Sequence, residues 1–395
     1  MLKEDIYHLA GELYKETVAH RRHLHTRPEL SFKEYGTSAF VADKLADLGI
    51  PFEKKADTGI VALLTGTKEV SERVVALRAD MDALPIEEEN EVPYKSQTVG
   101  VMHACGHDVH TSSLLATAGI LNRLKGRFSG TVKFIFQPGE EKLPGGASLM
   151  IREGVLRNPG PQAIIGQHVM PELPVGKAGF SSGSYMASND EIYITVTGRG
   201  GHAAMPHLTI DPVSIACQMI TALQQIVSRQ ANPLIPSVLS FGKIIANGSN
   251  NVIPDKVMIE GTFRTLHEAW REEAHKAMKG MAVSLVAGMG GNCTFEIRKG
   301  YPVLINEGGL TTEMRHHAED FLGKDKVVDL DIWMAAEDFA FYAQHVPGCF
   351  YRLGVGNEVN GITSGLHTST FDIDEKALET GSGLMAYLAL KFLGN

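Results

Sequence analysis

Short apolar runs alternate along the chain with longer segments in which apolar residues recur every three or four positions. The segments 74–82, 131–141, 163–169 and 349–354 each begin as an apolar run and pass directly into loop residues, which is typical of buried strands. A helical pattern at 111–126 separates the first two of them. Strands that alternate with helices predict an α/β fold whose mostly parallel sheet is covered by helices on both faces.

Residues 184–297 follow a different order. A strand and a helix are followed by two strands, and then by a second helix and a final strand. This β-α-β-β-α-β order is typical of the ferredoxin-like sandwich. We therefore predict a larger domain formed by residues 1–183 and 298–395, into which a smaller domain of residues 184–297 is inserted.

The length, charge and apolar content of the chain limit which kinds of binding partner we expect. The chain of 395 residues is too long for one ordinary core, and its 46 acidic and 37 basic residues give a net charge of -9. No run of lysine and arginine offers a surface for nucleic acid. We also expect no membrane partner, because no apolar segment approaches roughly 18 residues and the first residues lack a signal-peptide pattern. Four widely spaced cysteines favour a reducing cytoplasm.

A dense group of potential metal ligands occurs in residues 101–111, VMHACGHDVHT. Cys105 and His107 flank a glycine, whose conformational freedom lets the thiolate and the imidazole turn to the same side. Both are good ligands for zinc and its neighbours in the first transition row. The alternative is a polar loop that binds no metal.

Further polar residues follow the predicted strands: Asp80 and Asp82 after the first, Glu140 and Glu141 after the second, His168 after the third, and His367 in a loop after the fourth. Ligands of parallel sheets bind beyond the carboxyl ends of the strands, so we expect these residues at one rim. A solvated acidic turn is the alternative interpretation of the two glutamates.

The adjacent glutamates suggest two separate roles. Neighbouring residues of an extended chain point in opposite directions, so we expect Glu140 and Glu141 not to chelate one ion together. One of them could bind metal while the other takes a proton from an attacking water. With the thiol and the three imidazoles this makes five candidate ligands, too many for one tetrahedral ion that keeps a position open. The count favours two divalent ions.

Ten motifs together resemble the dinuclear metal amidohydrolases. They are RRHLHTRPELSFKEYGT (21–37), ALRADMDALPIEE (76–88), HACGHDVH (103–110), FQPGEE (136–141), GQHV (166–169), GRGGHAAMPH (198–207), NVIPD (251–255), GTFRT (261–265), EDFAFY (337–342) and LHTSTF (366–371). This group includes N-acyl-amino-acid amidohydrolases, hippurate hydrolases, N-acetyl-diaminopimelate deacetylases and auxin-conjugate hydrolases, and is related to aminoacylases and carboxypeptidase-G-like enzymes. The resemblance spans nearly the whole chain and is specific for the family rather than for a substrate.

The resemblance implies a role for each residue at the rim. It implies five ligands, with Cys105 bridging the two ions, His107 and His168 on one ion, and Glu141 and His367 on the other. Glu140 would be the general base, and Asp82 would orient a ligand imidazole and fix its tautomer; a structural carboxylate that caps the next turn is the alternative for Asp82. With the ligand set complete, His103, Asp108 and His110 are interpreted as structural or orienting residues.

In the inserted domain the resemblance points to three residues. His202 would stabilise the oxyanion, in many relatives from the partner subunit of a homodimer formed through this lid domain. Asn251 and Arg264 would contact the substrate, and the planar guanidinium of Arg264 suits a free carboxylate. A helix-capping role for the histidine, in a loop, and a domain-interface role for the other two are the alternatives. Ala336 stands where the family commonly has serine, which leaves the role of the EDFAFY segment open.

The sequence therefore predicts a cytoplasmic, metal-dependent amidohydrolase that cleaves N-acyl amino acids, small-molecule substrates, into a carboxylic acid and an amino acid. Its cofactors would be two divalent ions, with zinc favoured by the cysteine and histidine ligands and manganese, cobalt or nickel as alternatives. A dipeptidase or carboxypeptidase is the second hypothesis. A non-catalytic protein that only binds acyl amino acids is the third.

Overall fold

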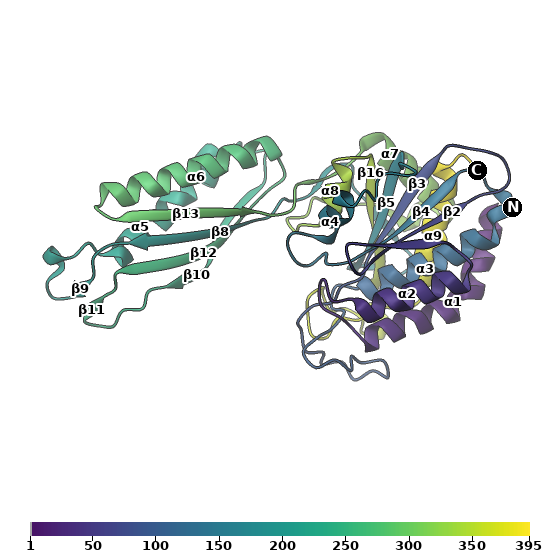
Figure 1. Ribbon diagram of the computed structural model, residues 1–395, viewed down its shortest axis with the longest axis horizontal. Helices are drawn as coiled ribbons and strands as arrows, with labels where there is room; N and C mark the ends of the chain where they lie inside the picture. Colours follow the sequence, from purple (N-terminus) through teal and green to yellow (C-terminus); the bar gives the residue numbers. More distant parts are fainter. Residues whose placement is uncertain (1) are drawn as a thin grey trace. The chain divides into compact units, whose positions relative to one another are not determined.

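The computed structural model describes residues 2–395 and divides the chain into two units (Figure 1). The larger unit contains the chain up to Gly183 together with Ile305–Asp331 and Asp338–Asn395. The smaller unit contains Ser184–Leu304 and Ile332–Glu337. Each unit has its own cluster of buried apolar side chains.

The larger unit is built on an eight-stranded sheet with the order β1-β2-β4-β3-β5-β16-β6-β15. Its strands are β1 (Phe52–Lys55), β2 (Gly59–Thr65), β3 (Val74–Asp80), β4 (Thr131–Gln137), β5 (Ala163–Pro174), β6 (Ala178–Phe180), β15 (Val327–Asp329) and β16 (Gly348–Gly356). The four central strands are parallel to one another. Every residue of β3, β4 and β16 is buried, as expected for central strands covered on both faces.

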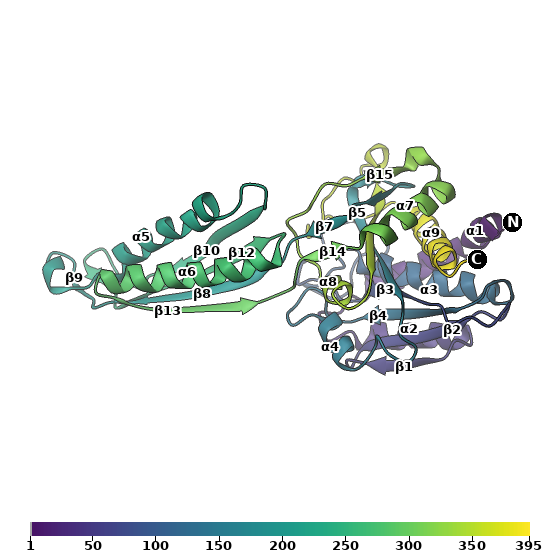
Figure 2. The same ribbon diagram turned by 90° about the horizontal axis from the view of Figure 1, so that it is seen from above.

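Helices cover both faces of this sheet (Figure 2). They are α1 (Leu2–Thr26), α2 (Tyr35–Asp47), α3 (His107–Arg123), α4 (Gly146–Arg152), α7 (Gly308–Leu322), α8 (Phe339–Ala343) and α9 (Ala377–Phe392). The helices α1, α3 and α9 pack against one another on one side, and the short helices α4 and α8 pack together on the other. The predicted α/β class with a mostly parallel sheet is confirmed.

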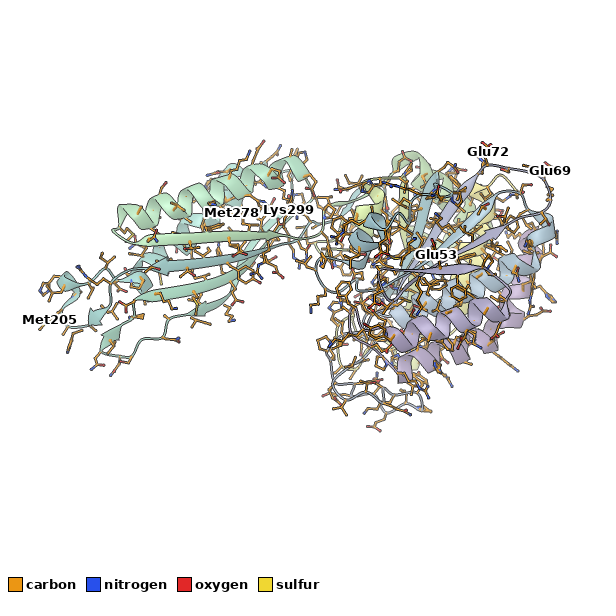
Figure 3. All side chains as sticks on the ribbon, in the orientation of Figure 1. Glu53, Glu69, Glu72, Met205, Met278 and Lys299 are labelled. Atoms are coloured by element: carbon orange, nitrogen blue, oxygen red, sulfur yellow. The ribbon has the colours of Figure 1, made fainter. Side chains whose placement is uncertain are left out.

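The smaller unit has the element order β-α-β-β-α-β. Its elements are β8 (Asp190–Thr197), α5 (Pro212–Gln225), β10 (Ser237–Ile245), β12 (Lys256–Thr265), α6 (Glu268–Gly288) and β13 (Asn292–Lys299). The strands form an antiparallel sheet in the order β10-β12-β8-β13. Buried and half-buried positions alternate along β8, and Met278 of α6 is fully buried whereas Met205 is half exposed (Figure 3).

Shorter elements complete the chain. The strands β9 (Gly201–His202) and β11 (Val252–Ile253) pair with each other in the smaller unit. The strands β7 (Gly183–Met186) and β14 (Leu304–Asn306) lie where the chain passes from one unit to the other. Among residues 2–395, no helix combines the length and the apolar character needed to cross a bilayer.

The boundary between the units falls later than the predicted position 297, which lies inside β13. Asn189 explains the extension, because its side chain accepts a hydrogen bond from the backbone of Tyr301 and its carbonyl accepts one from Gly300. The segment Ile332–Glu337 also belongs to the smaller unit. The backbone of Ala187 donates hydrogen bonds to two carbonyls of that segment.

Candidate active site

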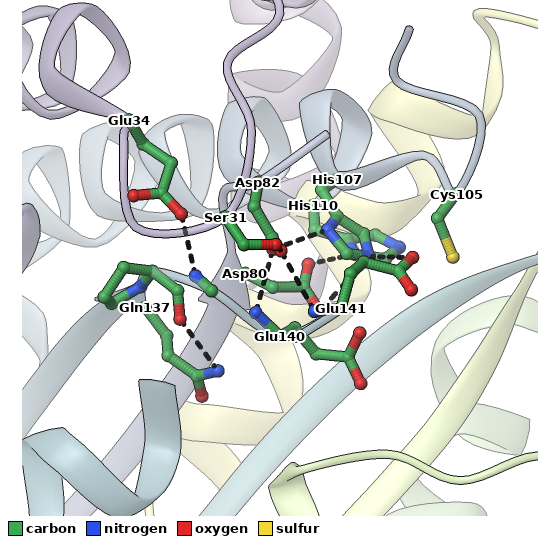
Figure 4. A network of polar contacts seen from close by, with 12 residues as sticks. Ser31, Glu34, Asp80, Asp82, Cys105, His107, His110, Gln137, Glu140 and Glu141 are labelled. Carbon is green, nitrogen blue, oxygen red and sulfur yellow. Dashed lines mark hydrogen bonds and ion pairs between the residues drawn. The ribbon is translucent and has the colours of Figure 1, made fainter. Parts of the chain in front are cut away.

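Asp82 lies just beyond β3 and organises the neighbouring loop (Figure 4). Its two carboxylate oxygens accept hydrogen bonds from the backbone N–H groups of Glu140 and Glu141, each at 3.0 Å. The hydroxyl of Ser31 donates to Oδ2 at 2.6 Å, and Nδ1 of His107 lies 3.2 Å from Oδ1. A single buried carboxylate thus fixes both glutamates and the tautomer of His107.

The first turn of α3 carries His107 directly after a left-handed glycine. Gly106 has φ +78°, and a Cβ built there would lie 2.5 Å from Cγ2 of Val169 on β5. Glycine is therefore required for the helix to begin this close to the sheet. The arrangement places Cys105 and His107 on either side of the turn, with both side chains buried.

Five side chains from distant parts of the chain converge beside this turn. The Cys105 sulfur lies 3.4 Å from Nε2 of His168 and 3.3 Å from Nε2 of His367. Oε1 of Glu141 lies 3.3 Å from Nε2 of His367 and 4.0 Å from Nε2 of His107. They form two groups of potential ligands that share the thiol: Cys105, His107 and His168 form one, and Cys105, Glu141 and His367 the other.

These donors fit divalent cations. Nε2 of His107 and Oε1 of Glu141 are buried without a hydrogen-bond partner, which is costly unless a cation satisfies them. Burial and the charge of Arg352 lower the pKa of His168 well below its ordinary value, so its imidazole is neutral. His168 also lies 2.8 Å through Nδ1 from the carbonyl of Val169, which leaves Nε2 free to face the thiol. Sulfur, nitrogen and oxygen donors of this kind suit zinc and similar metals.

The charges around the cluster also favour added cations. Burial and the carboxylates of Glu141 and Glu140 raise the pKa of Cys105 well above its ordinary value, so a thiolate forms only with added positive charge. Burial opposes a charge on His107, but Asp80 and Asp82 outweigh it and raise its pKa to about 10. A cation at Nε2 can take the place of the proton that these carboxylates attract.

Glu140 differs from its neighbour in position. It is 6% exposed, and its Oε1 accepts a 3.3 Å hydrogen bond from the backbone of Asp338. One oxygen from each glutamate and one nitrogen of His107 lie within 4.8 Å of one another. The expectation that Glu140 and Glu141 point in opposite directions is therefore wrong, because β4 ends at Gln137 and the two residues lie in a loop rather than in extended chain.

Asp338, in the EDFAFY segment, connects three neighbouring elements of the larger unit through hydrogen bonds. It accepts hydrogen bonds from Nη2 of Arg78 at 2.7 Å, from Gln137 at 2.8 Å and from the backbone of Ala147 at 3.0 Å. Arg78 in turn donates to Asp80 at 2.5 Å. The segment whose role the sequence left open thus ties the ends of β3 and β4 to the start of α4.

The remaining polar residues of α3 make contacts of their own. His110 lies 2.5 Å through Nδ1 from Asp80, and its Nε2 accepts the backbone N–H of Val169 at 2.9 Å. Asp108 lies 2.8 Å from both Arg21 and His25. His103 is buried as well. Neither Asp108 nor His103 is among the five converging side chains.

His202, Asn251 and Arg264 belong to the smaller unit. His202 and Asn251 lie on neighbouring segments, where the backbone of Ala203 donates a 3.0 Å hydrogen bond to the Asn251 carbonyl. Arg264 is part of β12 and donates to the carbonyl of Met334 at 3.0 Å. Burial lowers the pKa of Arg264. The roles expected for these three residues stay predictions.

Known proteins resemble the chain over almost all of its length. Residues 76–391 match peptidase family M20/M25/M40. An N-acyl-L-amino acid amidohydrolase of Geobacillus stearothermophilus is 43% identical over 78% of this chain and 82% of its own. A thermostable carboxypeptidase of Saccharolobus solfataricus is 39% identical over 99% of this chain and 98% of its own.

A solved structure agrees with these relatives. The crystal structure of a dinuclear metal-binding peptidase of the M20 family from Bacillus subtilis is 35% identical to the chain, with a TM-score of 0.84 over 97% of this chain and 99% of that one. The family predicted from the ten motifs is thereby confirmed. The chain belongs to peptidase family M20/M25/M40 and is an enzyme that hydrolyses amide bonds with divalent metal ions.

Proposed function

We propose that the enzyme hydrolyses the amide bond of N-acyl amino acids and releases a carboxylic acid and the free amino acid. The observation that carries this proposal is the pair of ligand groups that share Cys105, with the carboxylate of Glu140 beside them. The similarity to an N-acyl-L-amino acid amidohydrolase supports the choice of substrate.

The ligands divide between two cations. Cys105, His107 and His168 would hold one, and Cys105, Glu141 and His367 would hold the other. When bound, such a pair polarises a carbonyl group and lowers the pKa of water. Zinc suits the thiol and the imidazoles best, with manganese, cobalt and nickel as alternatives.

The protein side chains then move the protons. Glu140 takes a proton from the attacking water and delivers it to the nitrogen of the departing amino acid. Asp82 holds Nδ1 of His107 and so keeps Nε2 directed at the cation. His202 stabilises the oxyanion, and Asn251 and Arg264 bind the amino-acid part of the substrate, with Arg264 pairing with its carboxylate.

The smaller unit acts as a lid and as the dimerisation domain, and the enzyme works in the cytoplasm. The four cysteines are all free thiols, which suits a reducing compartment. Dimerisation is tested by light scattering at working concentration. A monomer would exclude both the dimer and a role for His202 across subunits.

The substrate is tested with the purified enzyme loaded with zinc, manganese, cobalt or nickel. Acetyl, benzoyl, succinyl and indoleacetyl amino acids are assayed beside unmodified dipeptides. We expect N-acetyl-leucine to have a higher kcat/KM than Gly-Leu. A higher value for Gly-Leu would instead favour a dipeptidase or carboxypeptidase, and binding of N-acetyl-leucine without any product would favour a non-catalytic binding protein.

A further inference from the structure

The motif at 21–37 contains a segment that the proposed chemistry does not use. Residues Ser31–Glu34 are the last part of the connection between α1 and α2 and lie against the loop that carries Glu140 (Figure 4). We call these four residues the brace. Ser31 donates to Asp82, as described above, and the preceding residue Leu30 forms a β-bridge with Ala83.

Glu34 connects the brace to the loop that carries Glu140. Its side chain is buried, and Oε1 accepts the backbone N–H groups of Phe32 and Gly139, both at 2.8 Å. Oε2 accepts the hydroxyl of Thr58 at 2.7 Å. Asp82 accepts the next two N–H groups, those of Glu140 and Glu141. Three consecutive backbone N–H groups of the loop therefore donate to two buried carboxylates.

Phe32 and Gly139 fit against each other closely. Both have left-handed backbone angles, φ +65° for Phe32 and φ +55° for Gly139. A Cβ at Gly139 would lie 2.2 Å from the Phe32 ring. A non-glycine residue in this conformation is uncommon and marks a site where the surroundings determine the backbone. The ring and the carboxylate of the brace therefore hold Gly139 from two directions.

The buried side chain of Glu34 does not serve to stabilise the start of α2. The residue occupies the N-cap position of α2, but its side chain makes no capping hydrogen bond to that helix. Glu29 caps the helix instead, because its two oxygens accept the N–H groups of Gly36 at 2.9 Å and Thr37 at 2.8 Å. The buried carboxylate of Glu34 is thus committed to Gly139, Phe32 and Thr58.

We propose that Glu34 is a positioning residue, which acts through Gly139 to hold the general base Glu140 in place. The inference rests on the proposed role of Glu140. Asp82 holds Glu140 and Glu141 together, whereas Glu34 holds only the Gly139 end of the loop. Loss of the Glu34 side chain should therefore displace the base Glu140 more than the metal ligand Glu141. We expect a clear decrease in kcat with little change in metal content.

Three variants of the full-length, zinc-saturated enzyme test this role. Glu34→Ala should lower kcat by about 10- to 100-fold, with a smaller change in KM and a metal content near that of the wild type. Glu34→Gln keeps an acceptor for the Gly139 N–H and should recover most of the activity. Glu29→Ala is the matched control, since it weakens the start of α2 without reaching Gly139, and should leave kcat unchanged.

Hydrogen exchange at the Gly139 amide provides a readout that does not need turnover. The amide should exchange faster in Glu34→Ala than in the wild type or in Glu29→Ala. If Glu34→Ala does not fold, Thr58→Val should give a smaller loss of kcat, because it removes only the donor to Oε2.

The proposal is overturned if Glu34→Ala has wild-type kcat and exchange, if Glu34→Gln is as inactive as Glu34→Ala, or if Glu29→Ala is equally inactive. It is also overturned if Thr58→Val, used in place of an unfolded Glu34→Ala, keeps wild-type kcat. A wild-type enzyme that cleaves no N-acyl amino acid would refute the proposed function. The exchange of Gly139 would still decide whether Glu34 holds the loop.

Discussion

At the scale of single residues, the two adjacent glutamates give the sharpest test of the site. Glu140→Gln should lower kcat by about 100- to 10,000-fold, because general acid–base catalysis contributes that much, while the metal content stays unchanged. Glu141→Gln is the matched variant and should instead weaken metal binding. Steady-state rates and metal analysis of both proteins distinguish the two roles. Turnover retained by metal-loaded Glu140→Gln would show that another group acts as the base.

The shared thiol makes a second prediction. Cys105→Ser should reduce the zinc bound per chain, because both ligand groups lose their common donor and a hydroxyl is a poorer ligand than a thiolate. Equilibrium dialysis followed by metal analysis measures the loss. Cys217→Ser is the control, since that exposed thiol lies outside both groups. Equal zinc content in the two variants would contradict the bridging role.

The sequence pointed to the five side chains that converge because thiol, imidazole and carboxylate groups at strand ends are chemically distinctive. It did not identify Ser31, Glu34 or Asp338, whose contacts run to backbone amides and side chains far away in the sequence. The motif at 21–37 was the available signal, but a motif does not reveal which N–H group a carboxylate accepts. The direction of Glu140 was missed for a related reason, since the end of β4 could not be located to the residue.

At the scale of elements, the start of α3 depends on Gly106. Gly106→Ala should destabilise the protein by about 1–3 kcal/mol, because the added methyl group collides with Val169 on β5. The left-handed backbone adds to this cost. Urea unfolding measures the change, and weaker zinc binding should accompany it because Cys105 and His107 flank the turn.

Gly126→Ala is the matched control for this substitution. It should have little effect on stability, since a Cβ there meets nothing within 4 Å. Equal stability of the two alanine variants would show that the close approach of α3 to β5 is not needed.

A buried lysine on β4 predicts a pH dependence. Lys133 donates to the carbonyls of Val155 and Arg157, both at 2.8 Å, and burial lowers its pKa from 10.5 to about 8. Between these two values the lysine is neutral in the folded protein and protonated in the unfolded chain. The unfolded state then binds the extra proton, so the free energy of unfolding should rise with pH in this window.

A comparison with Lys133→Met separates this effect from that of other groups that lose protons at alkaline pH. Urea unfolding at about pH 7.5 and about pH 10 should show the wild type gaining stability relative to the variant. The carbonyls left unpaired in the variant affect both pH values equally and cancel. A difference that stays constant or shrinks with pH would contradict the low pKa.

The central strands were predictable because each is a continuous apolar run, the pattern of a strand buried on both faces. The outer strands were not. The sequence of β1 is FEKK, with no buried residue, and β6 and β15 have three residues each. Such short strands contain too few residues to show the alternation of buried and exposed positions that identifies a strand. Their pairing is decided by the neighbouring strand.

At the scale of the whole molecule, metal removal should affect the two units differently. All five proposed ligands belong to the larger unit, and the smaller unit has its own apolar core. Ligand present at about 100 times its dissociation constant stabilises a folded state by about 2.7 kcal/mol. Chelation should therefore speed hydrogen exchange in the larger unit and leave core amides of α6 unchanged. Uniform destabilisation of both units would contradict this prediction.

In the sequence the order of strands and helices changes near residue 184, and the smaller unit of the structure begins at Ser184. The later boundary of the smaller unit was not visible in the sequence. It depends on hydrogen bonds of Asn189 with Tyr301 and of the Ala187 backbone with the segment Ile332–Glu337, and such contacts leave no periodic pattern. The preferred acyl group was equally beyond prediction, because no motif describes the residues that would contact it.

The scattered origin of the metal ligands bears on how the enzyme matures. The proposed donors extend from residue 105 to residue 367, and one of the two strands that flank β5 in the middle of the sheet is β16, which is synthesised long after β5. Domains fold as units while the chain emerges from its amino terminus. A nascent chain therefore carries an incomplete set of the proposed donors until residue 367 has been made, and two complete sites could be loaded with metal only after that point.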